Sequence, residues 1–268
     1  MAASSHLGGA LPPGRDHAPR RDQAARSICH YKERGRAMTI TLITGGNKGL
    51  GLETARRLVT EGQTVYVGAR SPERGEAAAV ELGANFVQLD VTDDVSVHNA
   101  MRVIDEREGR LDVLVNNAGT YDRIDGADGI TAAGAFAQFD TNAVGVVRVT
   151  QAALRLLHKS ENPVVVNVSS GLGSFAMVTD PDSHQFNVHS IVYSATKAAV
   201  DMLTVRYAQA VPDIKFNAVD PGRLATDLHG DYTAQSPTVG ADVVARVATI
   251  GADGPTGTFQ STNSELAW

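Results

Sequence analysis

Residues 44–51 read Thr-Gly-Gly-Asn-Lys-Gly-Leu-Gly, and they stand between a strand-like run at 39–44 and a helix-like run at 50–61. Glycines at a strand-to-helix turn let the backbone turn sharply and approach a bound pyrophosphate closely. The N–H groups at the start of the helix would then form an anion-binding site. A glycine-rich turn without a ligand is the alternative for this motif taken alone. The position of the motif favours a nucleotide cofactor more strongly than its glycine content does.

After this turn, the chain alternates short β-rich runs with longer helical stretches, which is typical of a parallel α/β sheet. Strand candidates such as 113–115 and 164–166 consist of valine and leucine, as expected of strands that are covered on both faces. The expected strands are 39–44, 64–69, 85–89, 111–116, 164–168, 215–219 and 257–260, and the expected helices are 50–61, 73–82, 95–108, 132–158, 192–211 and 238–250. The sequence therefore predicts a doubly wound, seven-stranded parallel sheet with helices on both faces.

Charge is distributed unevenly along the chain, which has 24 Lys and Arg residues, 30 Asp and Glu residues and a net charge of −6. Residues 1–38 have seven basic and three acidic side chains, a net charge of +4, so the remainder has a net charge of −10. This leader lacks periodicity and has too few large apolar residues to offset the entropy that ordering would cost. We therefore expect a disordered basic leader at 1–37, for which a transit peptide is the alternative, followed by a single domain at 38–268.

Composition excludes several kinds of protein. With 43% hydrophobic and 20% charged residues the chain is globular, and its one cysteine, Cys29, cannot form an internal disulfide. No stretch approaches the roughly 18 consecutive apolar residues of a membrane span, and the leader lacks the apolar run of a secretory signal. The negative net charge argues against binding to a nucleic-acid backbone. We therefore expect a cytoplasmic protein that has neither a membrane nor a nucleic acid as a partner.

Six further motifs follow the glycine turn in order, each at the end of an expected strand or on an expected helix. They are Asp90-Val91 after the third strand, Asn116-Asn117-Ala118-Gly119 after the fourth, Asn142 on the fourth helix, Ser170 after the fifth strand, Tyr193-Ser194-Ala195-Thr196-Lys197 at the start of the next helix, and Pro221-Gly222 with Thr226 after the sixth strand. In this order the motifs resemble those of the short-chain dehydrogenase/reductase family, and they cover nearly all of residues 39–260. The glycine turn is similar to that of carbonyl-reductase-like members. The resemblance implies a Rossmann-type fold and an oxidoreductase that acts on a carbonyl group or a secondary alcohol.

The resemblance also implies four catalytic residues, which are Asn142, Ser170, Tyr193 and Lys197. Tyr193 and Lys197 are four residues apart on one helix, so both side chains lie on the same face and can reach the same ligand. A free phenol has a pKa of about 10, and we expect the Lys197 ammonium, together with an oxidised nicotinamide, to lower the pKa of Tyr193. The resemblance gives Ser170 a hydrogen bond to the substrate oxygen and gives Asn142 a water that links Lys197 to solvent. Without the other motifs, an exposed lysine on an amphipathic helix would be the better interpretation of this pair.

Cofactor choice depends on the end of the second expected strand. A carboxylate there would bind the ribose 2′-hydroxyl of NAD, whereas an arginine accommodates the 2′-phosphate of NADP. Ala69 occupies the position of the acid, Arg70 follows it and Lys48 lies in the glycine turn, so we expect NADP (NADPH) as the cofactor. A surface arginine with no partner is the alternative for Arg70. The expected cofactor contacts are Gly45, Asn47, Lys48, Gly49, Leu50, Gly51, Arg70, Asp90 and Val91 beside the adenine, Asn117, Ala118, Gly119, Tyr193, Lys197, Pro221, Gly222, and Thr226 beside the nicotinamide carboxamide.

The stretch at 171–192 is longer than in most members of the family. We expect 175–189 to form a mobile lip over the substrate pocket, with a turn at 180–182. Its two histidines, His184 and His189, have no third ligand at a recognisable spacing, so we expect no metal. In carbonyl-reductase-like relatives an insertion at this place accompanies a monomeric state, so a monomer and a homo-oligomer both stay open.

We expect a small-molecule carbonyl compound or alcohol as the substrate and an NADP-dependent oxidoreductase as the function. A ketoreductase for a carrier-bound 3-oxoacyl or polyketide substrate is one alternative, although the net charge of −10 after the leader disfavours docking of an acidic carrier. A non-catalytic redox sensor that binds NADP is the other alternative, since a fold does not fix a function. Such a sensor has no use for the four catalytic residues together. The pocket walls at 120–131, 171–192 and 223–237 have conformations that spacing does not determine, so the sequence does not identify the substrate.

Overall fold

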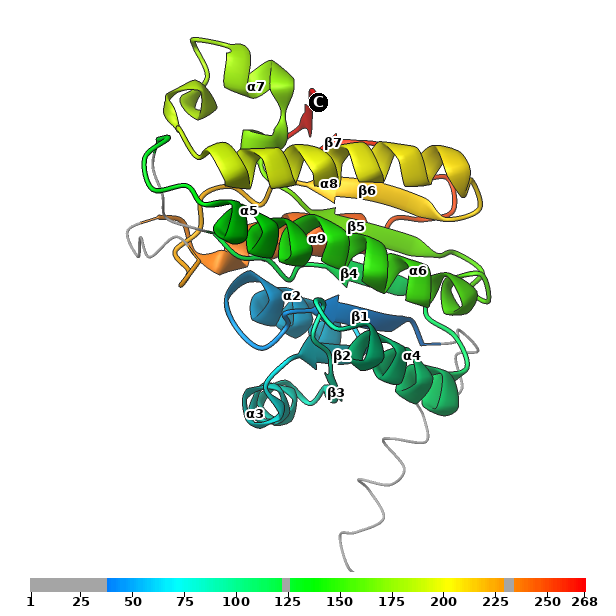
Figure 1. Cartoon of the computed structure of the whole chain (residues 1–268). Coiled ribbons are helices and arrows are strands. Elements are labelled where there is room, and N and C mark those ends of the chain that lie inside the picture. The colour runs from blue at the N-terminus through cyan, green and yellow to red at the C-terminus, as the bar shows by residue number, and fades with distance from the viewer. Residues whose placement is uncertain (1–37, 122–125, 229–233) are drawn as a thin grey trace, which may run out of the picture. The chain divides into compact units, whose positions relative to one another are not determined.

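A mostly parallel sheet runs through the domain in the strand order β3-β2-β1-β4-β5-β6-β7-β8 (Figure 1). The computed structural model describes residues 38–121, 126–228 and 234–268, so the leader expected at 1–37 lies outside the described residues. The strands are β1 (Ile40–Thr44), β2 (Thr64–Ala69), β3 (Asn85–Gln88), β4 (Val113–Asn116), β5 (Val164–Val168), β6 (Lys215–Val219), β7 (Phe259–Gln260) and β8 (Glu265–Leu266). Strands β1 to β7 pair in parallel, and winding reverses between β1 and β4, where open α/β sheets bind ligands. The predicted doubly wound α/β fold is confirmed.

The sheet has one more strand than the seven that the sequence predicts. The chain folds back after Gln260, and β8 pairs antiparallel with β7. The Ser261 N–H donates to the Ser264 carbonyl at 2.8 Å, and the Trp268 ring stacks on the Phe259 ring with centroids 5.3 Å apart. A strand of two residues is too short to show an alternating pattern in the sequence. It forms because β7 is available as a pairing partner.

Helices cover both faces of the sheet (Figure 1). They are α2 (Gly49–Thr60), α3 (Pro72–Leu82), α4 (Asp94–Glu108), α5 (Ala132–Phe139), α6 (Gly145–Leu157), α7 (Phe175–Thr179), α8 (Ile191–Ala210) and α9 (Pro237–Ala248), with short 3₁₀ turns η2 (Gly171–Gly173) and η3 (His184–Asn187). Successive strand residues point to opposite faces. Leu42 therefore packs in one core with α4 and α6, whereas Ile43 packs in a second core with α2, α3 and α9. In the part of the chain that the structure describes, no helix combines the length and apolar character that a membrane crossing needs.

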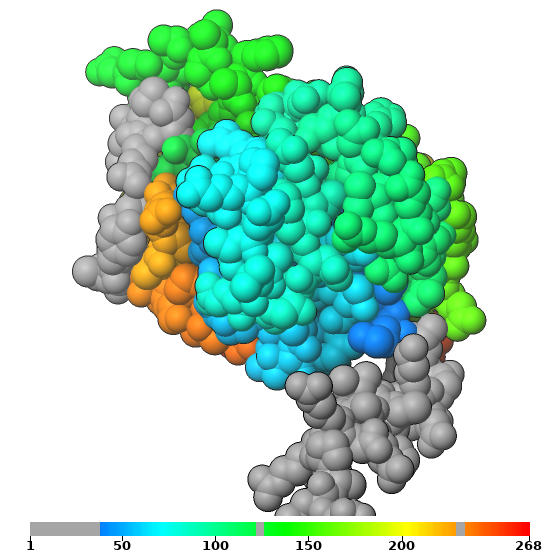
Figure 2. Space-filling model, turned by 90° about the horizontal axis from the view of Figure 1, so that it is seen from below, coloured from blue at the N-terminus to red at the C-terminus, as the bar shows by residue number. Residues whose placement is uncertain are grey.

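The β3 edge of the sheet lies next to helices α3 and α4, whose residues fill much of the face seen in Figure 2. Capping residues define the ends of both helices. The Ser71 hydroxyl accepts from the Arg74 N–H at 3.4 Å, and the Asp93 carboxylate accepts from the Val95 N–H at 2.9 Å. Gly83 ends α3 in the left-handed region, with φ of +67°. These local signals explain why the predicted helix positions agree closely with the structure here.

The helix expected at 132–158 is helical from 132 to 157 in the structure, but a π-helical segment η1 (Asp140–Val144) lies within it and separates α5 from α6. The side-chain amide of Asn142 in η1 accepts from the Thr120 N–H at 2.8 Å and donates to the Thr120 carbonyl at 2.9 Å. It also donates to the Thr196 hydroxyl at 3.1 Å. These partners are distant in sequence, so helical periodicity does not reveal the interruption. π-helical turns are frequent at functional sites.

Candidate active site

The glycine turn after β1 is built together with the segment that follows β4. Gly45 has φ of +65°, and a Cβ atom there would lie 3.1 Å from the Cα of Ala118. A Cβ atom on Gly51 would lie 2.5 Å from both the Asn117 amide nitrogen and the Gly45 carbonyl oxygen. The Asn117 amide donates to the carbonyl oxygens of Thr44 and Gly45 at 2.8 and 3.2 Å. The two sequence motifs are therefore parts of one interlocked structure.

The start of α2 is suited to an anion. Lys48 is the N-cap residue of α2, and its side chain makes no capping hydrogen bond. The first bond of the helix runs from the Leu52 N–H to the Lys48 carbonyl at 3.2 Å. The N–H groups of Gly49, Leu50 and Gly51 precede that bond, as the first N–H groups of any helix do. With the positive end of the helix dipole, they form a site that fits a diphosphate.

A cavity of about 970 Å³ lies at the carboxyl ends of the strands. Its volume is at the upper end of the range of about 300–1,000 Å³ that is typical of ligand sites. Every expected cofactor contact lines this cavity, and Ser170 does so as well. Asn142 is buried behind the wall, where a Cβ atom on Gly119 would lie 3.5 Å from its amide oxygen and 3.9 Å from the Lys197 Nζ. The residues present fit a dinucleotide cofactor with a substrate beside it.

Tyr193 and Lys197 lie in the first two turns of α8, and each is at most 5% exposed. The Lys197 Nζ donates to the Val168 carbonyl at 2.8 Å and lies 5.5 Å from the centroid of the Tyr193 ring. The Tyr121 ring meets the Tyr193 ring edge-on, with centroids 4.9 Å apart. Ser170 follows β5, and its hydroxyl accepts from the Leu172 N–H at 3.2 Å. The fold thus brings Ser170, Tyr193 and Lys197 to one end of the cavity.

The electrostatics of this pair differ from the expectation. Burial, reinforced by the negative charge of Asp220, raises the pKa of Tyr193, whereas the sequence argument expects a lowered value. Burial also lowers the pKa of Lys197 to about 8, although the carboxylates of Asp201 and Asp220 oppose this shift. Spacing shows that the lysine lies near the tyrosine. It does not show that both groups are removed from water, and that removal has the larger effect in the protein alone.

Comparison with known proteins identifies the family. The short chain dehydrogenase family matches residues 39–237 of this chain. The chain belongs to this family. A curated relative, the short-chain dehydrogenase anuI of Penicillium roqueforti, is 32% identical over 225 residues, which cover 79% of this chain and 89% of the relative. The chain is therefore an oxidoreductase of the short-chain dehydrogenase family, as the motifs predict.

Solved structures agree with this assignment. The structure of actinorhodin polyketide ketoreductase with NADPH is 27% identical in sequence to this chain and superposes with a TM-score of 0.73. The match covers 84% of this chain and 95% of the ketoreductase. NADPH-bound carbonyl reductase from chicken fatty liver has a TM-score of 0.76 at 24% identity, with 87% of this chain and all of that chain matched. Because the chicken carbonyl reductase is only 24% identical to this chain, that match shows a shared fold and nothing more.

Three polar residues at the site of this dehydrogenase are missed by the sequence reasoning. Asp201 lies four residues after Lys197 on α8, and burial raises its pKa to about 7. Asp220 precedes Pro221, and its carboxylate accepts from the Gly222 N–H at 2.9 Å. Gln138 on α5 lines the cavity, and within the described residues neither atom of its buried amide has a hydrogen-bond partner. The spacing of Asp201 on the face of Tyr193 and Lys197 is a signal that could have been read from the sequence.

The two cations expected at a 2′-phosphate both lie at the cavity. Arg70 is exposed directly after β2. The Lys48 Nζ pairs with the Asp227 carboxylate at 3.1 Å, and both side chains are more than half exposed. This ion pair connects the glycine turn with the segment that follows β6.

The expected lip at 175–189 contains the helix α7 and the turn η3. The Ser174 hydroxyl donates to the Ala267 carbonyl at 2.8 Å, and the Ala176 N–H donates to the Trp268 carbonyl at 3.1 Å. In Figure 1 the chain's last residues accordingly lie next to α7. Among residues 38–121, 126–228 and 234–268, no three His, Cys, Asp or Glu side chains gather as a metal site would require.

Proposed function

We propose that this dehydrogenase reduces a ketone or an aldehyde with NADPH and that Tyr193 is the general acid. The observation that carries the proposal is that Ser170, Tyr193 and Lys197 line the same cavity as the glycine turn. Carbonyl reduction needs a hydride donor at the carbon and a proton donor at the oxygen at the same time. One cavity that is shared by both sets of residues supports that reaction.

Residues of this chain would hold the cofactor along the length of the cavity. The first-turn N–H groups of α2 would bind the diphosphate, and Thr226 would bind the nicotinamide carboxamide. Although burial opposes it, hydrogen bonds from Thr92 lower the pKa of Asp90, so this carboxylate is charged at neutral pH and can accept a hydrogen bond from an adenine amino group. The bound nicotinamide supplies the hydride.

A preference for NADPH over NADH follows from charge. Ala69 leaves no carboxylate that would bind a free 2′-hydroxyl and repel a phosphate. Arg70 and Lys48 would each form a charge-assisted hydrogen bond with the 2′-phosphate, and Lys48 would exchange the Asp227 carboxylate for it. The NADPH in the structure of the actinorhodin ketoreductase supports the same choice.

Tyr193 is suited to donate a proton rather than to remove one. Its raised pKa keeps the phenol protonated at neutral pH, although Ser170 acts against this shift. Both hydroxyls would donate to the carbonyl oxygen of the substrate as negative charge develops there. Lys197, with a pKa of about 8, is mostly charged at neutral pH and would stabilise the phenolate that remains after proton transfer.

The test is a measurement of NADPH consumption by absorbance with the full chain and a panel of ketones, aldehydes, quinones and carrier-linked acyl thioesters, with NADH in parallel. We expect turnover of at least one small carbonyl compound and a lower KM for NADPH than for NADH. Tyr193→Phe should lower kcat by a factor of about 10²–10⁴ and leave the Kd of NADPH nearly unchanged. Tyr207→Phe is the matched control, because Tyr207 lies on the same helix, stacks on Phe216 and bonds with Gln151 away from the cavity.

Each other outcome contradicts a stated part of the proposal. Equal KM values for the two cofactors would refute the NADPH preference, and substantial turnover by Tyr193→Phe would refute its role as the acid. Turnover of carrier-linked thioesters alone would favour a ketoreductase for carrier-bound substrates. Tight NADPH binding without turnover of any compound would favour a redox sensor.

A further inference from the structure

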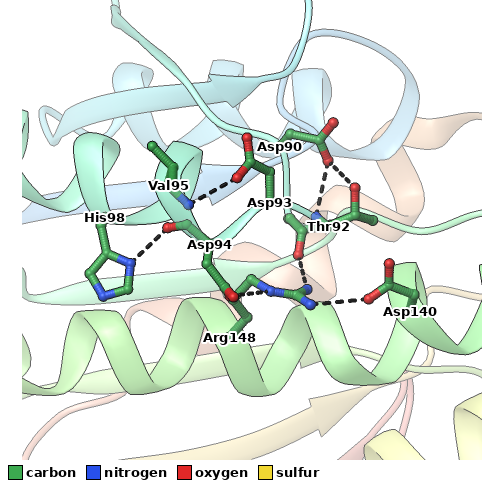
Figure 3. Close-up of polar contacts among 9 residues, drawn as sticks. Asp90, Thr92, Asp93, Asp94, Val95, His98, Asp140 and Arg148 are labelled. Carbon is green, nitrogen blue, oxygen red and sulfur yellow. Dashed lines mark hydrogen bonds and ion pairs between the residues drawn. The ribbon is translucent and has the colours of Figure 1, made fainter.

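Arg148, in the first turn of α6, joins three separate parts of the chain (Figure 3). Its Nε donates to the Asp94 carboxylate at 2.6 Å, and its Nη2 donates to the Asp140 carboxylate at 3.1 Å. Its Nη1 donates to the backbone carbonyl of Val91. The Arg148 side chain is 16% exposed and that of Asp140 is 25% exposed, so the bond to Asp140 is partly shielded from water, whereas Asp94 is 74% exposed. No sequence motif singles out this residue.

One side of this contact is the loop at 90–94, where the adenine of the cofactor is expected. Asp90, Val91 and Thr92 line the cavity, and Asp94 is the first residue of α4. A Cβ atom on Gly145 would lie 3.0 Å from the side chain of Val91, so the start of α6 packs directly against this loop. Arg148 therefore contacts a loop that also packs against the start of α6.

The other side of the contact is the segment that carries Asn142. Asp140 is the first residue of η1, and Asn142 lies two residues further along. The Asn142 amide is held by Thr120 and Thr196, and the latter residue immediately precedes Lys197 on α8. Figure 3 shows the Arg148 guanidinium between the loop at 90–94 and Asp140. A single side chain thus connects the adenine end of the cavity with the Asn142 segment.

Arginine is the residue type that this connection requires. Its planar guanidinium presents five donors in fixed directions, whereas a lysine ammonium is a compact charge on a flexible stem. Hydrogen bonds between ionised groups are shorter and stronger than neutral ones, and partial shielding from water increases the effect of the bond to Asp140. Lysine in this position could neutralise one carboxylate but could not reach all three acceptors in the same geometry.

We propose that Arg148 is a positioning residue that holds the loop at 90–94 and the η1 segment of Asn142 in one fixed arrangement. The inference rests on the proposed function, because the cofactor and Asn142 define the two ends that are coupled. Loss of Arg148 should weaken NADPH binding at one end and slow turnover at the other, although its side chain touches neither the substrate nor the reacting atoms.

The experiment compares Arg148→Met with Arg155→Met in the full chain. Arg155 lies on the same helix and pairs with Asp105 of α4 at 2.7 Å, so both variants remove one tie between α6 and α4. Fluorescence titration gives the Kd of NADPH without turnover, and steady-state kinetics gives kcat. We expect Arg148→Met to raise the Kd about tenfold and to lower kcat about tenfold, as loss of a charge-assisted bond predicts. Arg155→Met should change neither value by more than about twofold.

Two variants divide the effect, and a third tests the geometry. Asp94→Asn should mainly raise the Kd of NADPH, whereas Asp140→Asn should mainly lower kcat. Arg148→Lys should recover less than half of the free-energy change that Arg148→Met causes in the Kd of NADPH or in kcat. These variants also keep the inference testable if Arg148→Met does not fold.

Equal effects of Arg148→Met and Arg155→Met on both Kd and kcat would overturn the inference, as would full rescue by Arg148→Lys. A common loss of thermal stability with unchanged Kd and kcat would overturn it too. Failure of the parent chain to bind NADPH would instead refute the proposed function, so the two failures are distinguishable.

Discussion

Asp201 is the group through which pH should act most strongly on the stability of this dehydrogenase. Asp201 is 5% exposed, and burial disfavours its charged form more strongly than Ser169 and Lys197 favour it. The charged groups that face it are Lys197 on its own helix and Asp220 after β6. Burial raises the pKa of Asp201 from 3.8 to about 7, so the folded protein retains a proton that the unfolded chain releases at a lower pH.

The magnitude follows from this difference in pKa. A change of one pH unit in a pKa corresponds to about 1.4 kcal/mol, so a shift from 3.8 to about 7 corresponds to about 4 kcal/mol. Because the folded state binds more protons, the free energy of unfolding falls as the pH rises from about 4 to about 7. Asn cannot ionise, so Asp201→Asn should lack this loss. Lys197 loses a negative neighbour in the variant, so we expect a net gain of about 2–4 kcal/mol at pH 8 and almost none at pH 4.

The assay is urea denaturation of the parent and of Asp201→Asn at several pH values between about 4 and about 8. Asp242→Asn, an exposed position on α9, controls for the loss of one acidic side chain. A second signature is kinetic, because without Asp201 the pKa of Lys197 should fall below 8 and turnover should decline at a lower pH than in the parent. Parallel stability curves for the parent and Asp201→Asn would refute the reasoning.

Three further predictions concern the frame around the site. Gly51→Ala should abolish NADPH binding, because its Cβ would lie 2.5 Å from the Gly45 carbonyl oxygen; a titration that shows the parent's affinity would contradict the interlocked turn. Asp227→Asn should release Lys48 for the 2′-phosphate, which lowers the KM of NADPH by up to about fivefold and leaves the KM of NADH unchanged, since an exposed ion pair is worth at most about 1 kcal/mol. Equal changes for both cofactors would show that Lys48 does not exchange Asp227 for the phosphate. Trp268→Ala should lower the free energy of unfolding by about 1 kcal/mol in urea denaturation through loss of its aromatic stacking, and an unchanged midpoint would show that the packing has no energetic effect.

The sequence predicts the elements that local physics determines. The glycine turn, the apolar strands and the motifs at strand ends each act within a few residues, and the expected cofactor contacts line one cavity as a result. Structural features that depend on partners distant in the sequence cannot be predicted in this way. In the π-helical segment η1, Asn142 is hydrogen-bonded to Thr120 and Thr196, and the short strand β8 forms by pairing with the edge strand β7. Burial is missed as well: in the protein alone burial raises the pKa of Tyr193, whereas the sequence argument considers only Lys197 and an oxidised nicotinamide, which lower it.

Several residues that the family resemblance assigns to catalysis or to cofactor binding also hold the site together. The Asn117 amide bonds to the glycine turn, the Asn142 amide bonds to Thr120 and Thr196, and the Lys197 ammonium bonds to the Val168 carbonyl. Loss of activity after substitution of any of these therefore does not separate a chemical role from a structural one. The Tyr193 hydroxyl differs, because Tyr193 lines the cavity and Ser170, which affects the pKa of that hydroxyl, lines it as well. Removal of that one oxygen leaves the ring against Tyr121, which makes Tyr193→Phe the substitution that isolates the chemistry from the scaffold.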